Sequence, residues 1–225
     1  MGGRGSSFLL PVDDNSQWSG APNTERANAE MRDALGEKGK PKSIGDAVVA
    51  TNPYHSREYK EFAYNCQRCV VAYELRRRGY DVEAQATYRG DKLPQIAYLD
   101  PKTGARMARW QGAFRNAKTV HVGVDGSTKN AEKAVISNIE KQMHQYGSGS
   151  RAVIQVLWRN GGGHVFNVEN QGGRIVWVEA QTCLMRDQAE TMSHAKTGTI
   201  DLVRTDNLKL SGRITQFVRQ NTRKR

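Results

Sequence analysis

The first part of the chain lacks any regular spacing of apolar residues, whereas periodic patterns begin after about residue 44. Residues 1–23 are rich in Gly, Ser, Asn and Pro, a composition typical of disordered segments. Residues 23–35 have a weak apolar side that suggests a short helix, and residues 36–42 (GEKGKPK) resemble a linker. We therefore predict a disordered or weakly helical N-terminal arm and linker over residues 1–44 and one compact domain over residues 45–225.

Two segments of this domain have the spacing of helices. The clearest helix covers residues 130–146, where apolar residues recur every four positions before Gly147. These are Ala131, Val135, Ile139 and Met143. Residues 66–78 form a second segment with an apolar stripe, and Gly79 is a plausible stop. A short terminal helix is suggested at residues 214–218.

Short runs rich in β-branched and aromatic residues, bounded by turn-forming residues, predict strands. They lie at residues 80–88, 95–99, 118–124, 151–158, 163–169, 174–179 and 199–203, with a turn at residues 100–104. A helix followed by a cluster of antiparallel strands is an α+β layout.

One hairpin carries a candidate catalytic pair. Residues 163–169 and 174–179 are parted by residues 170–173 (NQGG), a Gly-containing gap typical of a β-hairpin. A turn centred between residues 171 and 172 sets His164 directly opposite Glu179, at a Cβ separation of ~4.5–5.5 Å. The carboxylate could then orient the imidazole. Gln181 shares the Glu179 face and is either a second orienter of the ring or a polar residue at the strand end.

Cys66 is the candidate nucleophile, because it follows Asn65, a residue type that caps helices, at the start of a predicted helix. Unpaired N–H groups at a helix start stabilise a thiolate, and an imidazole can accept the proton. Cys69 lies one turn deeper and would support packing or form a regulatory bond with Cys66. Alternatively, both cysteines are small core residues of an amphipathic helix.

The Cys-x-x-Cys pair has two other interpretations. A redox pair would follow a buried strand, which residues 63–65 (AYN) do not resemble. A zinc site would add His164 and Cys183, but only one knuckle-like pair is present, so we expect no metal. The remaining histidines have no strand-opposed carboxylate that we can identify and are expected to be surface or packing residues. They are His55, His121, His144 and His194.

The formal net charge of +11 favours acidic partners. The basic residues are spread along the chain, however, with short clusters at residues 76–78 and 223–225, and they do not alternate with aromatic residues. Nucleic-acid binding is therefore an alternative but not the favoured explanation, and solvated faces are the simpler one. The only early apolar run, residues 8–12, is too short for a signal peptide or a membrane span. We expect a cytoplasmic protein with no membrane association and with reduced cysteines.

Three motifs together resemble the papain-fold toxin family, also called the toxin glutamine deamidases. They are residues 65–79 (NCxxCVxAxELxxxG), residues 163–167 (GHVFN) and residues 178–182 (VEAQT). Related modules occur in bacterial polymorphic toxins and in phage head-associated proteins. The resemblance covers about residues 45–220, including residues 206–208 (DNL), and leaves the N-terminal arm outside.

The resemblance implies a papain-like α+β fold, in which an N-terminal helix bearing the nucleophile packs on an antiparallel sheet. It also implies a Cys-His-acid triad that hydrolyses or deamidates amides. By position, Cys66 would be the nucleophile, His164 the base and Glu179 the orienting acid, with Gln181 beside it. The family usually has Asp in place of Glu179 and Gly in place of Cys183, so the longer acid has to fit and the turn after residue 182 can differ.

The combined expectation is a cysteine-nucleophile amide hydrolase without a cofactor, namely a protein glutamine deamidase-type toxin or phage-associated effector. The first alternative is a papain-like peptidase or isopeptidase, and the second is a catalytically weak phage structural or binding module. The expected partners are a protein substrate and either an immunity protein or phage head proteins. The expected location is the cytoplasm of a bacterial or host cell, or the virion.

Overall fold

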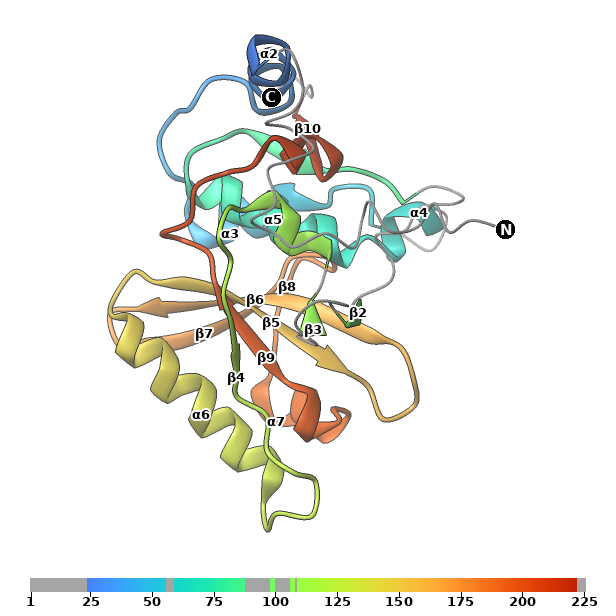
Figure 1. Cartoon of the computed structure of the whole chain (residues 1–225), viewed down its shortest axis with the longest axis vertical. Helices are drawn as coiled ribbons and strands as arrows, with labels where there is room; N and C mark the ends of the chain where they lie inside the picture. Colours follow the sequence, from blue (N-terminus) through green and yellow to red (C-terminus); the bar gives the residue numbers. More distant parts are fainter. Residues whose placement is uncertain (1–23, 56–58, 88–97, 100–105, 108, 222–225) are drawn as a thin grey trace.

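A computed structural model describes residues 24–55, 59–87, 98–99, 106–107 and 109–221 (Figure 1). The predicted disordered arm and the predicted turn at residues 100–104 lie outside the described residues. A mixed sheet-and-helix domain is seen, with helices on both faces of a six-stranded antiparallel sheet. The α+β class is therefore confirmed.

The sheet has the strand order β4-β9-β5-β6-β7-β8, and every neighbouring pair is antiparallel. The strands are β4 (Thr119–His121), β5 (Arg151–Leu157), β6 (Gly163–Gln171), β7 (Arg174–Glu179), β8 (Leu184–Met185) and β9 (Asp201–Arg204). The central strands β5 and β6 are buried on both faces, because helices cover both sides. Their near-continuous apolar runs follow from this two-sided burial.

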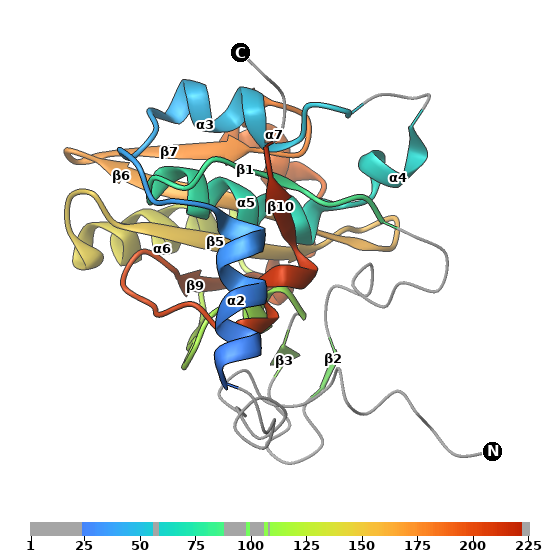
Figure 2. The same ribbon diagram turned by 90° about the horizontal axis from the view of Figure 1, so that it is seen from above.

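Helix α5 (Cys66–Arg77) packs on one face of the sheet, above β6 (Figure 2). Eleven of its twelve residues are buried, so the predicted single apolar stripe is wrong. The reason is a further layer over its outer side, formed by α3 (Ile44–Thr51) and by β1 (Val82–Ala84) paired with β10 (Val218–Gln220). The helix ends as predicted at Gly79, where φ is +106° and an added Cβ would collide with the carbonyl oxygen of Gly39.

Helix α6 (Ala131–Tyr146) lies on the opposite face of the sheet. Its four buried residues are the four that the sequence pattern predicts. The short helix α7 (Gln188–Ser193) packs beside it. A spacing of four residues over a long segment is a purely local pattern, which explains why this helix is predicted so well.

The β6–β7 hairpin has a different register from the predicted one. Gln171 pairs with Arg174 and Asn167 with Val178, so the turn is the two residues Gly172 and Gly173 alone. Their φ angles are +63° and +97°, the left-handed values that a two-residue hairpin turn requires. Each β6 residue therefore faces a partner two positions further along β7 than predicted. A shift of two keeps every side chain on its predicted face.

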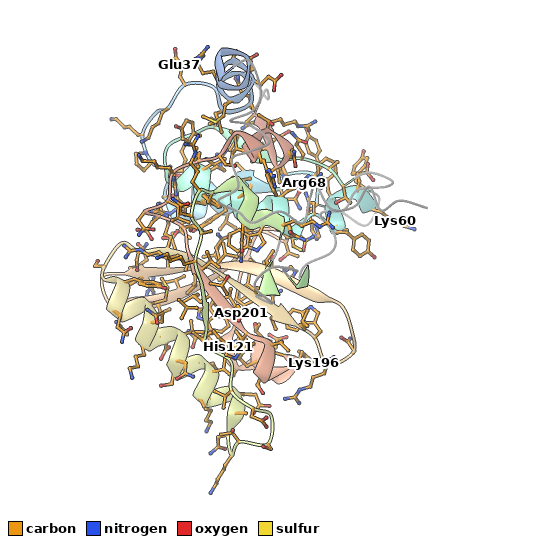
Figure 3. All side chains as sticks on the ribbon, viewed as in Figure 1. Glu37, Lys60, Arg68, His121, Lys196 and Asp201 are labelled. Atoms are coloured by element: carbon orange, nitrogen blue, oxygen red, sulfur yellow. The ribbon has the colours of Figure 1, made fainter. Side chains whose placement is uncertain are left out.

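The predicted N-terminal helix is present as α2 (Thr24–Leu35), and it packs against β10 and the 3-10 helix η4 (Gly212–Gln216) (Figure 2). Glu37, just after α2, lies at the far end of the molecule from His121 on β4 (Figure 3). The predicted terminal helix is this η4, followed by strand β10. The division of the chain at residue 44 stays a prediction, although Leu35, on the arm side of it, is buried in the core.

The remaining elements connect these layers. They are α4 (Lys60–Ala63), β2 (Tyr98–Leu99), β3 (Arg106–Met107), η2 (Arg109–Ala113) and η3 (Thr197–Thr199). Within the described residues, no helix combines the length and the apolar character that crossing a bilayer requires.

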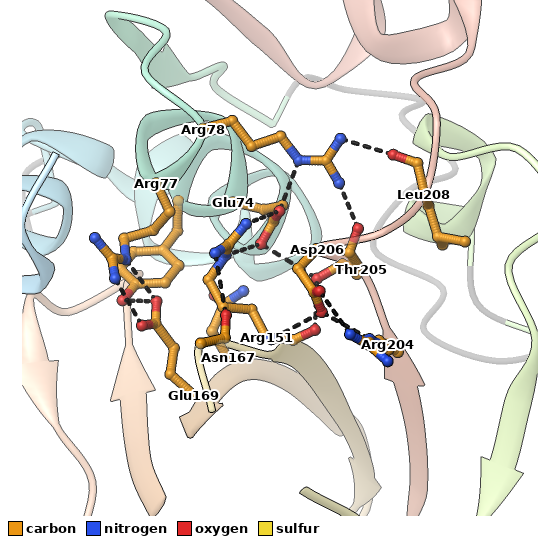
Figure 4. A network of polar contacts seen from close by, with 12 residues as sticks. Glu74, Arg77, Arg78, Arg151, Asn167, Glu169, Arg204, Thr205, Asp206 and Leu208 are labelled. Atoms are coloured by element: carbon orange, nitrogen blue, oxygen red, sulfur yellow. Dashed lines mark hydrogen bonds and ion pairs between the residues drawn. The ribbon is translucent and has the colours of Figure 1, made fainter. Parts of the chain in front are cut away.

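Two fully buried carboxylates hold α5 on the sheet (Figure 4). Glu74 of α5 accepts hydrogen bonds from Arg78 at 2.7 Å and from Arg151 of β5 at 2.9 and 3.0 Å. Glu169 of β6 accepts from Arg77 of α5 at 2.7 and 2.9 Å. These ion pairs link the helix that carries Cys66 to the two central strands.

The cluster at residues 76–78 is therefore not a solvated face. Arg76 is itself buried, with its guanidinium bonded to Asp81 at 2.8 Å and to the carbonyl oxygen of Val82 at 2.9 Å. The solvated-face interpretation is wrong for this cluster because the layer over α5 lets its arginines meet protein acceptors instead of water.

Candidate active site

Three side chains far apart in the sequence meet between α5 and the sheet. Cys66 is the first residue of α5, His164 the second residue of β6 and Glu179 the last residue of β7. The His164 Nε2–H donates to Glu179 Oε2 at 2.6 Å. All three residues are nearly buried, with exposed fractions of 8% for Cys66, 9% for His164 and 3% for Glu179. A small opening thus remains at the thiol and the imidazole.

The Cys66 side chain is close enough to the His164 imidazole to help raise the pKa of that ring. Since Nε2 is engaged by Glu179, Nδ1 is the ring nitrogen left for the thiol. The thiol and the carboxylate are therefore left different nitrogens of one ring. A possible nucleophile, a possible base and a group that orients the base are therefore arranged in space in the order that nucleophilic catalysis requires.

Glu179 reaches His164 diagonally and not from the directly opposed position that we predicted. Continuing the β6–β7 register past its last pair, Asn167 and Val178, would set His164 opposite Gln181. Diagonal neighbours lie ~7–8 Å apart, a separation that only a longer side chain can bridge. Glu has one more methylene group than the Asp expected at this position, and this extra length lets the carboxylate span the diagonal separation. The strand register therefore suits a Glu at position 179.

Arg186 also binds Glu179, and the sequence analysis missed it. Its guanidinium donates to the same Oε2 through Nε at 2.6 Å and through Nη2 at 2.5 Å. The guanidinium lies over the rings of Phe166 and Trp158, 5.0 and 5.9 Å from their centroids. No spacing pattern in the sequence predicts the position of Arg186, because this residue follows a non-periodic turn and the edge strand β8.

The charges of this cluster reinforce one another. Burial opposes a charged imidazole, but Glu179 and the nearby Cys66 outweigh it and raise the pKa of His164 from 6.5 to about 10. Burial likewise opposes a charged Glu179, but His164 and Arg186 outweigh it and lower the pKa of that carboxyl from 4.5 to about 2. At neutral pH the pair is therefore an imidazolium and a carboxylate.

Gln181 supports Glu179 and does not orient the ring. Its backbone N–H donates to Glu179 Oε1 at 3.1 Å, while its side-chain amide donates to the carbonyl oxygen of Ala63 at 2.8 Å. Its carbonyl oxygen accepts from the Asn52 side chain at 2.8 Å. Gln181 thus links the acid-bearing strand to the segment just before Cys66.

Asn65 is at the N-cap position of α5, but its side chain makes no capping hydrogen bond, contrary to the prediction. Instead, its amide and that of Asn52 donate to each other's oxygen at 3.1 and 3.2 Å. Asn65 Oδ1 also accepts from the thiol of Cys69 at 3.2 Å. This buried amide pair fixes the position of the residue that precedes Cys66. Asn52 is the residue at the C-terminal end of α3, so no local pattern in the sequence indicates this contact.

The other two cysteines have different surroundings from Cys66. Cys69 is 1% exposed, and burial raises the pKa of its thiol. Cys183 is half-buried with its pKa also raised by burial, and its φ of +60° lies in the left-handed region that glycine adopts without strain. Across the described ranges, no three His, Cys, Asp or Glu side chains are grouped to hold a metal ion, which leaves the zinc alternative without a site.

His121 does have a strand-opposed carboxylate, contrary to the prediction. It pairs with Asp201 in the β4–β9 ladder, and its Nδ1 is 2.8 Å from Asp201 Oδ1. The two residues lie beside each other on the sheet (Figure 3). β4 and β9 are eighty residues apart, and no turn connects them, so the pairing could not be read from local spacing.

Iodoacetamide is expected to label Cys66 faster than Cys69 and Cys183 near neutral pH. A charged imidazole favours nucleophilic attack by a cysteine beside it, and His164 is such a neighbour of Cys66, whereas burial raises the pKa of the other two thiols. Time-resolved mass spectrometry of the labelled peptides measures the three rates. In His164→Ala, the Cys66 rate should fall toward that of Cys183, with Cys183 itself unchanged. Equal rates at Cys66 and Cys183 in the native chain would contradict an activated thiolate.

The comparisons with known proteins agree with the resemblance. A family model described as papain fold toxin 1, glutamine deamidase, matches residues 64–183, more than half of the 225-residue chain. The match includes Cys66, His164 and Glu179. No curated protein and no solved structure matches the chain.

Proposed function

Because the chain belongs to the papain fold toxin 1, glutamine deamidase family, we propose that it converts glutamine side chains of a protein substrate to glutamate through a cysteine nucleophile. The observation that carries the proposal is the convergence of Cys66, His164 and Glu179 from one helix and two strands on a single imidazole ring. Each contact places a group where this chemistry needs it, and the substrate contributes only a carboxamide.

In the first half of the reaction, the Cys66 thiolate attacks the carboxamide carbon of glutamine, and the C=O electron pair moves onto oxygen. Backbone N–H groups at the start of α5, which have no acceptor within the helix, stabilise this oxyanion. When the C=O bond re-forms, the C–N bond breaks and the nitrogen takes the proton of the His164 imidazolium. Ammonia leaves, and the glutamyl group remains as a thioester on Cys66.

In the second half, neutral His164 accepts a proton from water as the water oxygen attacks the thioester carbon. The second tetrahedral intermediate collapses with loss of the Cys66 sulfur, which releases glutamate and restores the thiolate–imidazolium pair. Glu179 keeps the ring in one orientation through both halves, and Arg186 keeps Glu179 in place. No metal or cofactor is required by these steps.

A protein substrate and action in the cytoplasm of a bacterial or host cell are part of the same proposal. An immunity protein would be the partner of a toxin of this kind, and head proteins would be the partners of a phage-associated form.

Mass spectrometry of cell-lysate proteins tests the reaction type. Lysates treated with the native chain, and with the Cys66→Ala variant as control, are compared for conversion of glutamine to glutamate and for free ammonia. Conversion that depends on Cys66 supports the deamidase. New peptide or isopeptide ends without conversion would instead identify a peptidase, and no difference from the control would leave only a binding module.

The His164–Glu179 pair is expected to stabilise the fold most between about pH 4.5 and 6.5. The pKa of His164 is raised, so its contribution is complete below 6.5 and is lost as the pH rises toward 10. The pKa of Glu179 is lowered, so its contribution is complete above 4.5 and is lost as the pH falls toward 2.

Urea unfolding of the native chain and of Glu179→Gln across this pH range measures the effect. The difference in free energy of unfolding between the two should be largest inside the window and shrink on both sides of it. A difference that does not vary with pH would mean that the pair is not charged in the folded protein.

A further inference from the structure

A cavity of about 500 Å³ opens beside the candidate catalytic acid, and the chemistry proposed above does not use it. Glu179 and Arg186 both line it. Trp158 lines it too, and its ring stacks on that of His164 with 6.0 Å between the centroids. The cavity is therefore continuous with the carboxylate side of the site and is not a separate depression.

The two arginines that line the cavity each have a carboxylate partner. Arg186 binds Glu179, and Arg159 Nη2 donates to Glu132 at 2.6 Å. Each guanidinium therefore already has a carboxylate beside it. The cationic part of the wall therefore belongs to ion pairs within the protein.

Two of the three acidic residues of the wall, Asp187 and Glu190, are not neutralised. Both are exposed, and neither has a cationic side chain within ion-pair distance in the part of the chain that the structure describes. Asp187 accepts the backbone N–H of Glu190 at 2.7 Å, which fixes its carboxylate at the start of α7. The cavity thus has an apolar and aromatic wall next to two unpaired negative charges.

Strand β8 forms the apolar wall and is also the edge of the sheet. Its residues Leu184 and Met185 are 61% and 53% exposed, although both are large and apolar. The strand order ends at β8, so among the described residues no further strand pairs with its outer side. A free strand edge with exposed apolar side chains can add an extended segment of another protein.

We propose that this cavity is the subsite for a Lys or Arg residue of the protein substrate, carried on an extended segment that lies along β8 near the target glutamine. The aliphatic stem of that residue covers Leu184, Met185 and Trp158, and its cationic head reaches Asp187 and Glu190. This subsite rests on the proposed deamidase function, because it defines which glutamines the chain selects.

The position of the cavity sets how far the basic residue is from the glutamine. Cys66 and Glu179 are left different nitrogens of the His164 ring, so the cavity begins one imidazole beyond the thiol. An extended chain advances ~3.3 Å per residue, which places the basic residue roughly two to four positions from the glutamine.

The net charge of +11 attracts acidic proteins at long range, whereas the carboxylates of Asp187 and Glu190 act over a few ångströms. A basic residue is therefore selected locally even in an acidic substrate.

Binding of short labelled peptides to the full-length Cys66→Ala variant tests the subsite without turnover. Each peptide has one glutamine and either Lys, Ala or Glu two, three or four positions to either side, and fluorescence anisotropy gives the affinity. In the best register, the Lys peptide should bind about three- to fivefold more tightly than the Ala peptide, and the Glu peptide more weakly than both. Equal affinities in every register, or no measurable binding of any peptide, would overturn the proposal.

Charge variants in the same Cys66→Ala background locate the effect. Glu190→Gln should bring the ratio of Lys to Ala affinity toward one, and Glu190→Lys should reverse the preference in favour of Glu. Glu37→Gln removes the same charge at the far end of the molecule (Figure 3) and should leave the ratio unchanged. An equal change in Glu37→Gln would show a general charge effect and overturn the subsite.

The outcomes separate the subsite from the reaction. Glutamine conversion by the active chain without any preference for Lys would overturn the subsite alone. A Lys preference in binding, without conversion of any glutamine by the active chain, would overturn the proposed function and leave a peptide-binding cavity.

Discussion

Cys66→Ala is expected to lower glutamine conversion by at least about 10⁴-fold, because removing the nucleophile of such a triad removes the covalent route entirely. The rest of the site, the helix start and the cavity, would remain but would have no group to form the thioester. Ammonia release under single-turnover conditions measures the loss. The thermal unfolding midpoint should stay near that of the native chain, since the side chain removed is small.

Cys183→Ala is the matched control for this prediction. It removes a thiol from the same region, but the hydrogen bond of the Cys183 thiol is to the carbonyl oxygen of Val49 at 3.9 Å and not to the His164 ring, so conversion should stay within about threefold of the native rate. If activity survived in Cys66→Ala and disappeared in Cys183→Ala, our assignment of Cys66 as the nucleophile would be wrong. Activity that survives in both would remove the covalent mechanism altogether.

Glu74→Gln is expected to lower the free energy of unfolding by about 3 kcal/mol, or the melting temperature by roughly 6–12 °C. Glu74 is fully buried, and its carboxylate is bonded to both Arg78 and Arg151. The neutral amide would leave two guanidinium groups without their counter-charge between α5 and the sheet (Figure 4). Calorimetry or urea unfolding measures the change.

Glu132→Gln provides the comparison. It removes a carboxylate from an ion pair of similar length, 2.6 Å to Arg159, but both side chains are substantially exposed, at 38% and 56%. Water and salt screen such a pair, so we expect a much smaller loss than in Glu74→Gln. A similar loss in the two variants would mean that the buried network does not hold α5 to the sheet.

The network also fixes the spacing between the proposed nucleophile and the proposed base. Cys66 and Glu74 are two turns apart on α5, and His164 and Glu169 are both on β6. The ion pairs of Glu74 and Glu169 therefore fix the same two elements whose other ends carry the thiol and the imidazole. Rigid elements held by buried contacts are what a preorganised site requires.

Much of the site was predictable, because its elements have local patterns. The four-residue spacing of residues 131–143 predicts helix α6, and the Gly-Gly turn between two β-branched runs predicts the β6–β7 hairpin. Side chains alternate between faces with a period of two, so His164 and Glu179 share a face in any register shifted by an even number of residues. The prediction of a His–Glu pair therefore survived an error in the turn.

Contacts between distant segments were not predictable in the same way. Those of Arg186 and Asn52 near the site, and the His121–Asp201 pair elsewhere on the sheet, depend on which segments lie side by side after folding. Their partners are separated by intervening turns or by tens of residues, and no periodicity relates them. The arginines at 76–78 belong here too, since only the covering layer of α3, β1 and β10 makes their helix buried on all sides.

The amino-acid sequence by itself determined the family, the α+β class, the choice of thiol, imidazole and acid for the proposed triad, and the shared face of the last two. Tertiary structure alone decided the diagonal contact that suits Glu179, the arginine that shares its oxygen, and the buried ion pairs that seat the nucleophile helix. The physical reason is the distance along the chain over which each interaction acts. Periodicity and turn chemistry act between neighbours along the chain, whereas register, burial and charge pairing depend on groups that meet only once the layers have packed.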